Sequence, residues 1–137
     1  MAAQLNSHTL TVVIPHYRHA HLLERAVGSA LAQASQTCSV EVLVVDDGSR
    51  ADDLAKVRQI VCNDKRIRLI EHGENRGVVA ALNTGLGDVN TEFVSFLGAD
   101  DAVLPGWADA LVDLLTRFDG SAFACARAAL VNGSGEV

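Results

Sequence analysis

The sequence lacks several features that would place the protein in a common functional class. No apolar run approaches the roughly 20 residues that a membrane-spanning helix needs. Basic residues are few, 11 Lys and Arg against 17 Asp and Glu, which gives a net charge of −6. Because binding to nucleic acid needs clustered basic side chains, this balance argues against nucleic acid as a partner. The N-terminus has no basic segment followed by an apolar one, so no signal peptide is visible.

Cysteine is also scarce. Its three positions, Cys38, Cys62 and Cys125, are odd in number and far apart, and no CxxC spacing occurs. A disulfide framework or a zinc site is therefore not expected. We predict reduced thiols in a cytoplasmic protein, with each cysteine a small side chain in the core or at its boundary.

What the sequence does contain is a regular alternation of strand-like and helical patterns. The predicted strands are 10–15, 40–47, 66–72 and 92–98, and the predicted helices are 21–33, 51–63, 78–87 and 106–118. A last apolar run, 121–131, is rich in alanine, so its pattern fits a strand or a helix, and we expect a fifth strand. This order predicts one domain over residues 1–137, a three-layer α/β/α fold with a mostly parallel, Rossmann-like sheet.

Segments rich in reactive side chains follow each predicted strand. They read PHYRHAH, DDGSRADD, HGENRG and GADD in chain order. Because parallel strands end at the same edge of a sheet, and ligands bind beyond that edge, these segments predict one binding site. The first turn carries no GxGxxG motif and no P-loop sequence occurs, so neither of these nucleotide sites is expected.

Asp100 and Asp101 stand directly after an apolar strand, where two neighbouring carboxylates repel each other. A hard divalent cation such as Mg²⁺ or Mn²⁺ prefers oxygen ligands and often bridges to phosphates. A metal that carries a diphosphate would offset the cost of placing the two charges there. The alternative is that the pair caps the N-terminus of the helix that follows. The other acid pair, Asp46 and Asp47 at the end of the second predicted strand, favours the metal.

Four segments together resemble the N-terminal half of a family 2 glycosyltransferase, which is inverting and has the GT-A fold. They are TVVIPHYRHAHLLERAVGSALAQ, VEVLVVDDGSRADD, ENRGVVAALNTGL and EFVSFLGADDAVLPGWADAL. The resemblance covers about residues 9–118, and the order and spacing of the four segments make it specific. It implies transfer of a sugar from a nucleotide-sugar, with UDP as the expected nucleotide, to the hydroxyl of a saccharide or another acceptor.

The resemblance also implies roles for residues in the nucleotide site. Pro15 and Tyr17 would line the pocket for the base, and Asp47 would accept a hydrogen bond from an imide N–H of that base. Asp46 would orient the turn. Arg76 would face the donor, although its neighbours match the family motif better than it does.

The resemblance further implies that the GADD sequence of the last segment binds the metal and the sugar. Asp101 would bind Mn²⁺ or Mg²⁺, which bridges the two phosphates and acts as a Lewis acid on the departing diphosphate. Asp100 would contact the ribose or the sugar, beside the metal.

Three departures from the family pattern stand out. Gly98 replaces a frequent Asp, which predicts weaker or altered metal binding, and Arg18 replaces a frequent Asn. The sequence offers no credible general base, so we expect the catalytic base and the acceptor-binding half beyond Val137. A sheet edge left bare by a missing half would allow a homodimer.

Histidines and the single tryptophan admit other interpretations. His16, His19 and His21 lie close together and would suit a transition metal, but partly exposed loop histidines are the favoured interpretation. His72 is predicted to be a surface residue at a strand end. Trp107 is predicted to pack in the core rather than on a ligand.

Two other classes of protein share some of these features. A two-component receiver domain is also a parallel α/β unit with an acid pair for Mg²⁺. Its acid pair follows the first strand and a Lys follows the fifth, whereas here the first strand ends in Pro-His-Tyr and no Lys follows Lys65. The other rival is a non-catalytic nucleotide-binding or assembly module that kept the fold and lost the transfer activity.

Overall fold

The computed structural model describes residues 8–134 and residue 136. Strands and helices alternate along the chain. They are β1 (His8–His16), α1 (Ala20–Leu31), β2 (Cys38–Asp46), α2 (Ala51–Cys62), β3 (Ile67–Glu71), α3 (Val78–Gly87), β4 (Phe93–Phe96) and α4 (Trp107–Arg117). The four predicted strands and four predicted helices are therefore confirmed, with ends that shift by a few residues.

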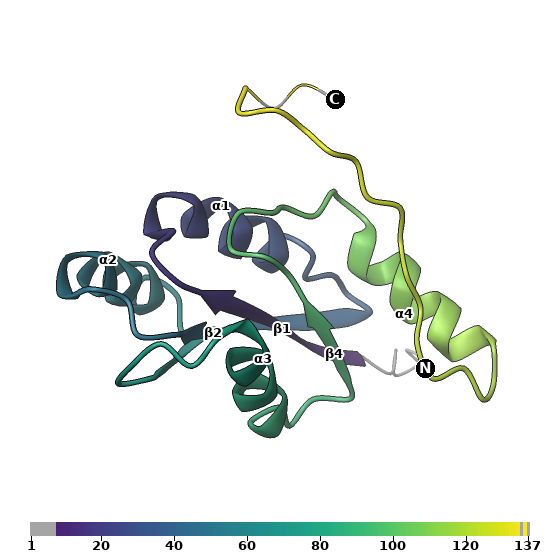
Figure 1. Ribbon diagram of the computed structural model, residues 1–137. Coiled ribbons are helices and arrows are strands. Elements are labelled where there is room, and N and C mark those ends of the chain that lie inside the picture. Colours follow the sequence, from purple (N-terminus) through teal and green to yellow (C-terminus); the bar gives the residue numbers. More distant parts are fainter. Residues whose placement is uncertain (1–7, 135, 137) are drawn as a thin grey trace.

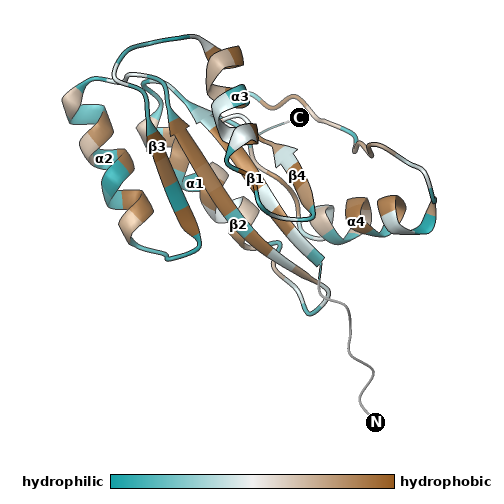
Figure 2. Ribbon diagram, turned by 90° about the horizontal axis from the view of Figure 1, so that it is seen from below, coloured by the Kyte–Doolittle hydropathy of each residue, from teal (hydrophilic) through white to brown (hydrophobic). Residues whose placement is uncertain are grey.

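The four strands form one parallel sheet in the order β3-β2-β1-β4. Figure 1 shows α1, α2 and α4 on one face of this sheet and α3 on the other, which confirms the three-layer α/β/α fold. Both faces of the central strands are covered, so neighbouring residues such as Val12 and Val13 are fully buried on opposite sides. Figure 2 shows the resulting hydrophobic (brown) strands, flanked by helices that have both hydrophobic (brown) and hydrophilic (teal) residues.

The core is unequal on the two sides of the sheet. The larger cluster joins β1 and β2 to α1, α2 and α4, and Trp107 packs against it while partly buried, as predicted. The smaller cluster lies under α3, where Gly85 allows a close approach: a Cβ there would lie 2.4 Å from the Val13 Cγ1 atom. This contact sets α3 directly against the centre of the sheet.

Residues 121–131 form neither a strand nor a helix, so the prediction of a regular fifth element is wrong. Figure 1 shows this segment as the yellow-green to yellow trace that follows α4, runs back past it and then moves away from the sheet. Its first part, residues 122–124, lines a pocket with residues 93–95 of β4. Phe123 and Leu130 are 81% and 93% exposed. A strand needs a hydrogen-bonded neighbour, and β4 pairs with β1 but with no strand on its other side among the described residues.

The cysteine positions are confirmed only in part. Cys38 is buried in the core, while Cys62 and Cys125 are exposed rather than at a core boundary. Within the described residues, no helix is both long enough and apolar enough to cross a membrane.

Candidate functional site

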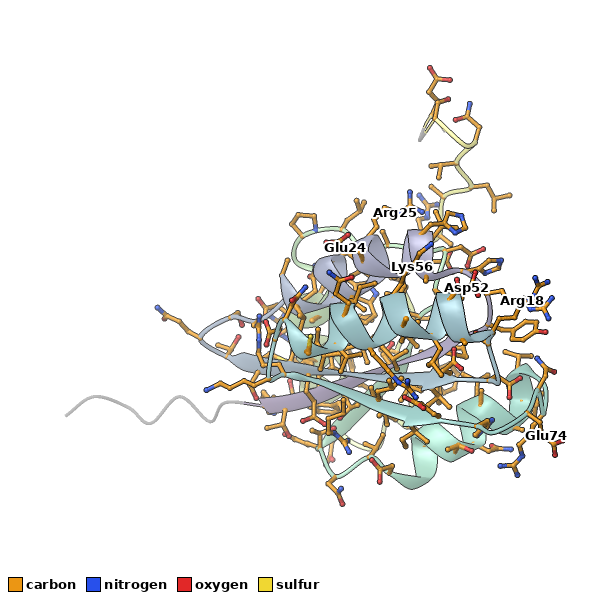
Figure 3. The ribbon with its side chains drawn as sticks, turned by 90° about the vertical axis from the view of Figure 1, so that its left-hand side faces the viewer. Arg18, Glu24, Arg25, Asp52, Lys56 and Glu74 are labelled. Atoms are coloured by element: carbon orange, nitrogen blue, oxygen red, sulfur yellow. The ribbon has the colours of Figure 1, made fainter. Side chains whose placement is uncertain are left out.

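The loops that follow β1, β2 and β3 meet at the carboxyl edge of the sheet. His16, Asp46 and Glu71 lie side by side in the register of the three strands. Figure 3 views the sheet from the side and shows Arg18 and Glu74, which mark the first and third loops, at the same end of the molecule. The predicted gathering of these segments at one edge is therefore present.

Asp46 is buried, with both of its carboxylate oxygens used inside the protein. Its Oδ1 accepts a hydrogen bond from His16 Nδ1 at 2.8 Å, and its Oδ2 accepts one from the Ser49 backbone N–H at 3.0 Å. The side chains of His16 and Asp46 are both 0% exposed. Asp46 thus links the turn after β2, through Ser49, to the end of β1, through His16.

His16 also faces α2 through its second ring nitrogen. Its Nε2 accepts the His19 backbone N–H at 3.1 Å and lies 3.5 Å from Asp53 Oδ2. Our interpretation of His16 as a partly exposed loop histidine is therefore wrong. His19 and His21 are exposed, and the described residues contain no group of three His, Cys, Asp or Glu side chains that could hold a metal ion.

Asp47 is 3% exposed and accepts three hydrogen bonds from the loop after β3. Its Oδ1 accepts from His72 Nδ1 at 2.7 Å and from the Arg76 backbone N–H at 2.9 Å, and its Oδ2 accepts from the Gly77 backbone N–H at 2.8 Å. Burial raises the pKa of Asp47, but these hydrogen bonds outweigh it and hold the pKa below the ordinary value of 3.8. Asp47 is therefore ionised at neutral pH.

His72 lies in the candidate site, and our interpretation of the sequence missed it. It is buried, not on the surface as predicted, and it contacts Asp47. An available signal was its position directly after β3, at the edge where the reactive segments gather. The side chain of Arg76 is exposed, and its hydrogen bond to Asp47 comes from its backbone.

Pro15 and Tyr17 lie partly buried around the end of β1. The Arg18 guanidinium stacks over the Tyr17 ring, with its carbon 4.7 Å from the ring centroid. Arg18 has a positive φ of 59°, which is uncommon for a residue with a side chain, and its N–H donates to Ser49 Oγ at 3.0 Å. The first loop is thereby fastened to the turn after β2.

Asp100 and Asp101 are both exposed in the loop after β4. A Cβ built on Gly98 would lie 2.6 Å from Asp101 Oδ2 and 2.9 Å from Asp100 Oδ1, so the two carboxylates face one point beside Gly98. Arg25 on α1 donates to the Asp100 backbone carbonyl at 2.6 Å and fixes this loop from outside.

The alternative that this acid pair caps the following helix is wrong. Helix α4 begins at Trp107, its N-cap residue is Gly106, and no side chain caps it. Asp100 and Asp101 precede it by a stretch of loop, and they are left free to bind a cation or a group that donates hydrogen bonds.

A family model described as glycosyl transferase family 2 matches residues 11–135. The chain belongs to glycosyl transferase family 2. The succinoglycan biosynthesis protein ExoO of Rhizobium meliloti is 39% identical over 112 residues, which cover 82% of this chain and 30% of that protein. An uncharacterised glycosyltransferase of Rickettsia conorii is 35% identical over 113 residues, 82% of this chain and 18% of its own.

Solved structures of glycosyltransferases share the fold, which is the GT-A fold. Staphylococcus aureus TarS 1–349 in complex with UDP superposes with a TM-score of 0.67 at 25% identity, over 80% of this chain and 32% of that one. The mannosyltransferase PcManGT from Pyrobaculum calidifontis, in complex with GDP-Man and Mn²⁺, gives a TM-score of 0.61 at 30% identity, over 70% and 28%. This family 2 chain thus spans about a third or less of the length of these relatives.

Proposed function

We propose that this chain is the donor-binding part of an inverting glycosyltransferase that uses a UDP-sugar and a divalent cation. The observation that carries the proposal is the placement of the Asp100 and Asp101 carboxylates, which are exposed at a strand end and face one point beside Gly98. Family membership and the ligands of the related structures, UDP in one and GDP-Man with Mn²⁺ in the other, support it.

The two carboxylates fit a hard cation such as Mn²⁺ or Mg²⁺, because both supply oxygen ligands and leave other positions open to phosphate and water. Asp101 would hold the cation, with Asp100 beside it toward the ribose or sugar. The cation, when bound, would supply positive charge to the departing diphosphate. Arg25 would keep the loop in place through the Asp100 carbonyl.

The protein groups at the other loops would bind the nucleotide. Pro15 and Tyr17 would line the base site, Asp47 would accept an imide N–H, and Asp46 would hold the turn that carries Asp47. Arg76, which is exposed, would face the donor. In the reaction, the bond from the sugar to the diphosphate breaks, a bond to the acceptor oxygen forms with inversion, and the acceptor proton passes to a base.

We place that base and the acceptor site outside this chain, in a protein of which residues 1–137 form one GT-A-type domain. The acceptor would be a saccharide or another hydroxyl compound. A cytoplasmic location stays a prediction.

The proposal is tested by calorimetric titration of UDP into the protein, with and without Mn²⁺. We expect binding in the presence of Mn²⁺ and at least about tenfold weaker binding without it, because the cation screens the diphosphate from the acidic loop. Titrations with dTDP and GDP test the choice of base. If none of the three nucleotides bound under either condition, the proposal would be wrong.

We also propose that the protein can pair with a second copy through the open edge of β4. Val94 and Phe96 of this strand are 38% and 48% exposed, and their outer backbone groups have no strand partner among the described residues. Sedimentation velocity at rising concentration should show a monomer converting to a dimer. A sedimentation coefficient independent of concentration, at the monomer value, would contradict the dimer.

A further inference from the structure

Two neighbouring aspartates, Asp46 at the end of β2 and Asp47 directly after it, are each held by a different buried histidine. His16 at the end of β1 holds Asp46, and His72 in the loop after β3 holds Asp47. Both side chains of the second pair are 4% exposed. The proposed function gives Asp47, and not Asp46, a contact with the nucleotide base. The pair of His72 and Asp47 is therefore the one that affects nucleotide binding directly.

The His72 ring is fixed at both nitrogens. Its Nδ1 lies 2.7 Å from Asp47 Oδ1, and its Nε2 lies 2.9 Å from Thr84 Oγ1 on α3. An ionised carboxylate only accepts hydrogen bonds, so the proton must sit on Nδ1. In the neutral ring, Nε2 then accepts from the Thr84 hydroxyl. Asp47 is thereby tied through His72 to a helix that packs directly on the sheet.

The hydrogen bonds to Asp47 leave little room for another donor. Oδ1 already accepts from two groups, His72 Nδ1 and the Arg76 N–H, whereas Oδ2 accepts from the Gly77 N–H. Each carboxylate oxygen has two lone pairs, so Oδ2 keeps one for an incoming N–H. The direction of that lone pair depends on the rotation of the carboxylate, which the His72 side chain fixes together with the backbone N–H groups of Arg76 and Gly77.

We propose that His72 is a positioning residue for the nucleotide base, which holds Asp47 so that Oδ2 offers its free lone pair to an imide N–H. This inference rests on the proposed function, because it takes Asp47 as the acceptor for the base. Thr84 anchors the ring from α3 and shares the role. The ligand class selected is a nucleotide whose base carries an N–H at this point, such as uracil, over one that does not, such as cytosine.

The rival explanation is that His72 merely ties the loop after β3 to α3. The two explanations predict different effects of removing His72 on the preference between nucleotide bases. Loss of a structural tie would weaken all nucleotides equally. Loss of a positioned acceptor would weaken UDP, which has an imide N–H, and would leave CDP nearly unchanged, because the matching nitrogen of cytosine is itself an acceptor.

The experiment titrates UDP and CDP, each with Mn²⁺, into the wild type and the variants His72→Leu, His72→Asn and Thr84→Val. In His72→Leu we expect UDP affinity to fall about tenfold, as for loss of a hydrogen bond to a charged group, with CDP unchanged. His72→Asn keeps an N–H near the place of Nδ1 and should restore most of the UDP affinity. The UDP affinity of Thr84→Val should lie between those of the wild type and His72→Leu.

The control is His8→Leu. His8 pairs with the Glu92 carboxylate at 2.9 Å, but it lies at the start of β1, at the opposite end of the sheet. This variant removes a histidine–carboxylate pair of the same type and should leave the affinities for UDP and CDP unchanged. Thermal unfolding of each variant shows whether it folds, and Thr84→Val, which is a small change, carries the test if His72→Leu does not fold.

The pH dependence of UDP binding gives a second readout. Protonation of Asp47 removes the acceptor, so binding falls as the pH drops through the pKa of Asp47. Among the described residues, His72 is the titratable side chain in contact with this carboxylate, and the neighbouring Asp46 pairs with His16 instead. Because the His72 hydrogen bond lowers the Asp47 pKa, the loss in His72→Leu should begin at a higher pH.

The outcomes are distinct. The inference is supported if the ratio of UDP affinity to CDP affinity falls in His72→Leu and recovers in His72→Asn. Equal weakening of both nucleotides, or no change, overturns it and leaves the proposed function standing. Failure of the wild type to bind UDP overturns the proposed function, and this inference with it.

Discussion

Asp101→Ala is expected to abolish the Mn²⁺-dependent part of UDP binding. The substitution removes one of the two carboxylates that face the point beside Gly98. With Gly98 offering no third carboxylate, Asp100 alone is left to hold the cation. Since the cation then no longer offsets the charge between the diphosphate and the acidic loop, we expect UDP affinity in Mn²⁺ to fall to the metal-free level, about tenfold or more below the wild type. Calorimetry with and without Mn²⁺ measures the effect.

Asp113→Ala provides the matched control. Asp113 is a carboxylate on α4 that pairs with Arg117 at 2.7 Å, in the next element after the acidic loop. Its removal changes the net charge by the same amount but should leave the effect of Mn²⁺ unchanged. A variant Asp101→Ala that kept the full effect of Mn²⁺ would show that the cation binds elsewhere.

Gly48→Ala is expected to cost about 3 kcal/mol of the free energy of unfolding, because two penalties add. Gly48 has a φ of 76°, where a side chain costs roughly 1–2 kcal/mol. A Cβ there would also lie 2.4 Å from the backbone carbon of Glu74 and 2.5 Å from the nitrogen of Asn75. Overpacking against backbone costs roughly 1–3 kcal/mol. Urea unfolding of the variant and the wild type gives the difference.

Gly120→Ala separates the two penalties. Gly120 has a φ of 84°, but a Cβ there would meet nothing within 4 Å. This variant therefore carries the backbone penalty alone. If Gly48→Ala destabilised the protein no more than Gly120→Ala, the loop at Glu74 would be able to move aside at little cost. The close approach of the second and third loops would then contribute little to the site.

Local patterns were enough to predict the order of the elements. Strand and helix periods arise from side chains a few positions apart, so they are visible in the sequence before any contact is known. The gathering of the reactive segments also followed, because the carboxyl ends of parallel strands meet at one edge. Residues 121–131 were apolar enough for a strand, but a strand also needs a partner, and that partner is not local.

The sequence by itself determined that an α/β sheet carries paired aspartates at its carboxyl edge, and its motifs identified the family. Only the tertiary structure decided which histidines are buried and what they bind. His16 and His72 look like ordinary loop residues in the sequence, whereas the packing of β1, β2 and β3 places each beside a different aspartate. The reason is physical: burial and hydrogen bonding of a polar side chain depend on neighbours from distant strands, which no local pattern specifies.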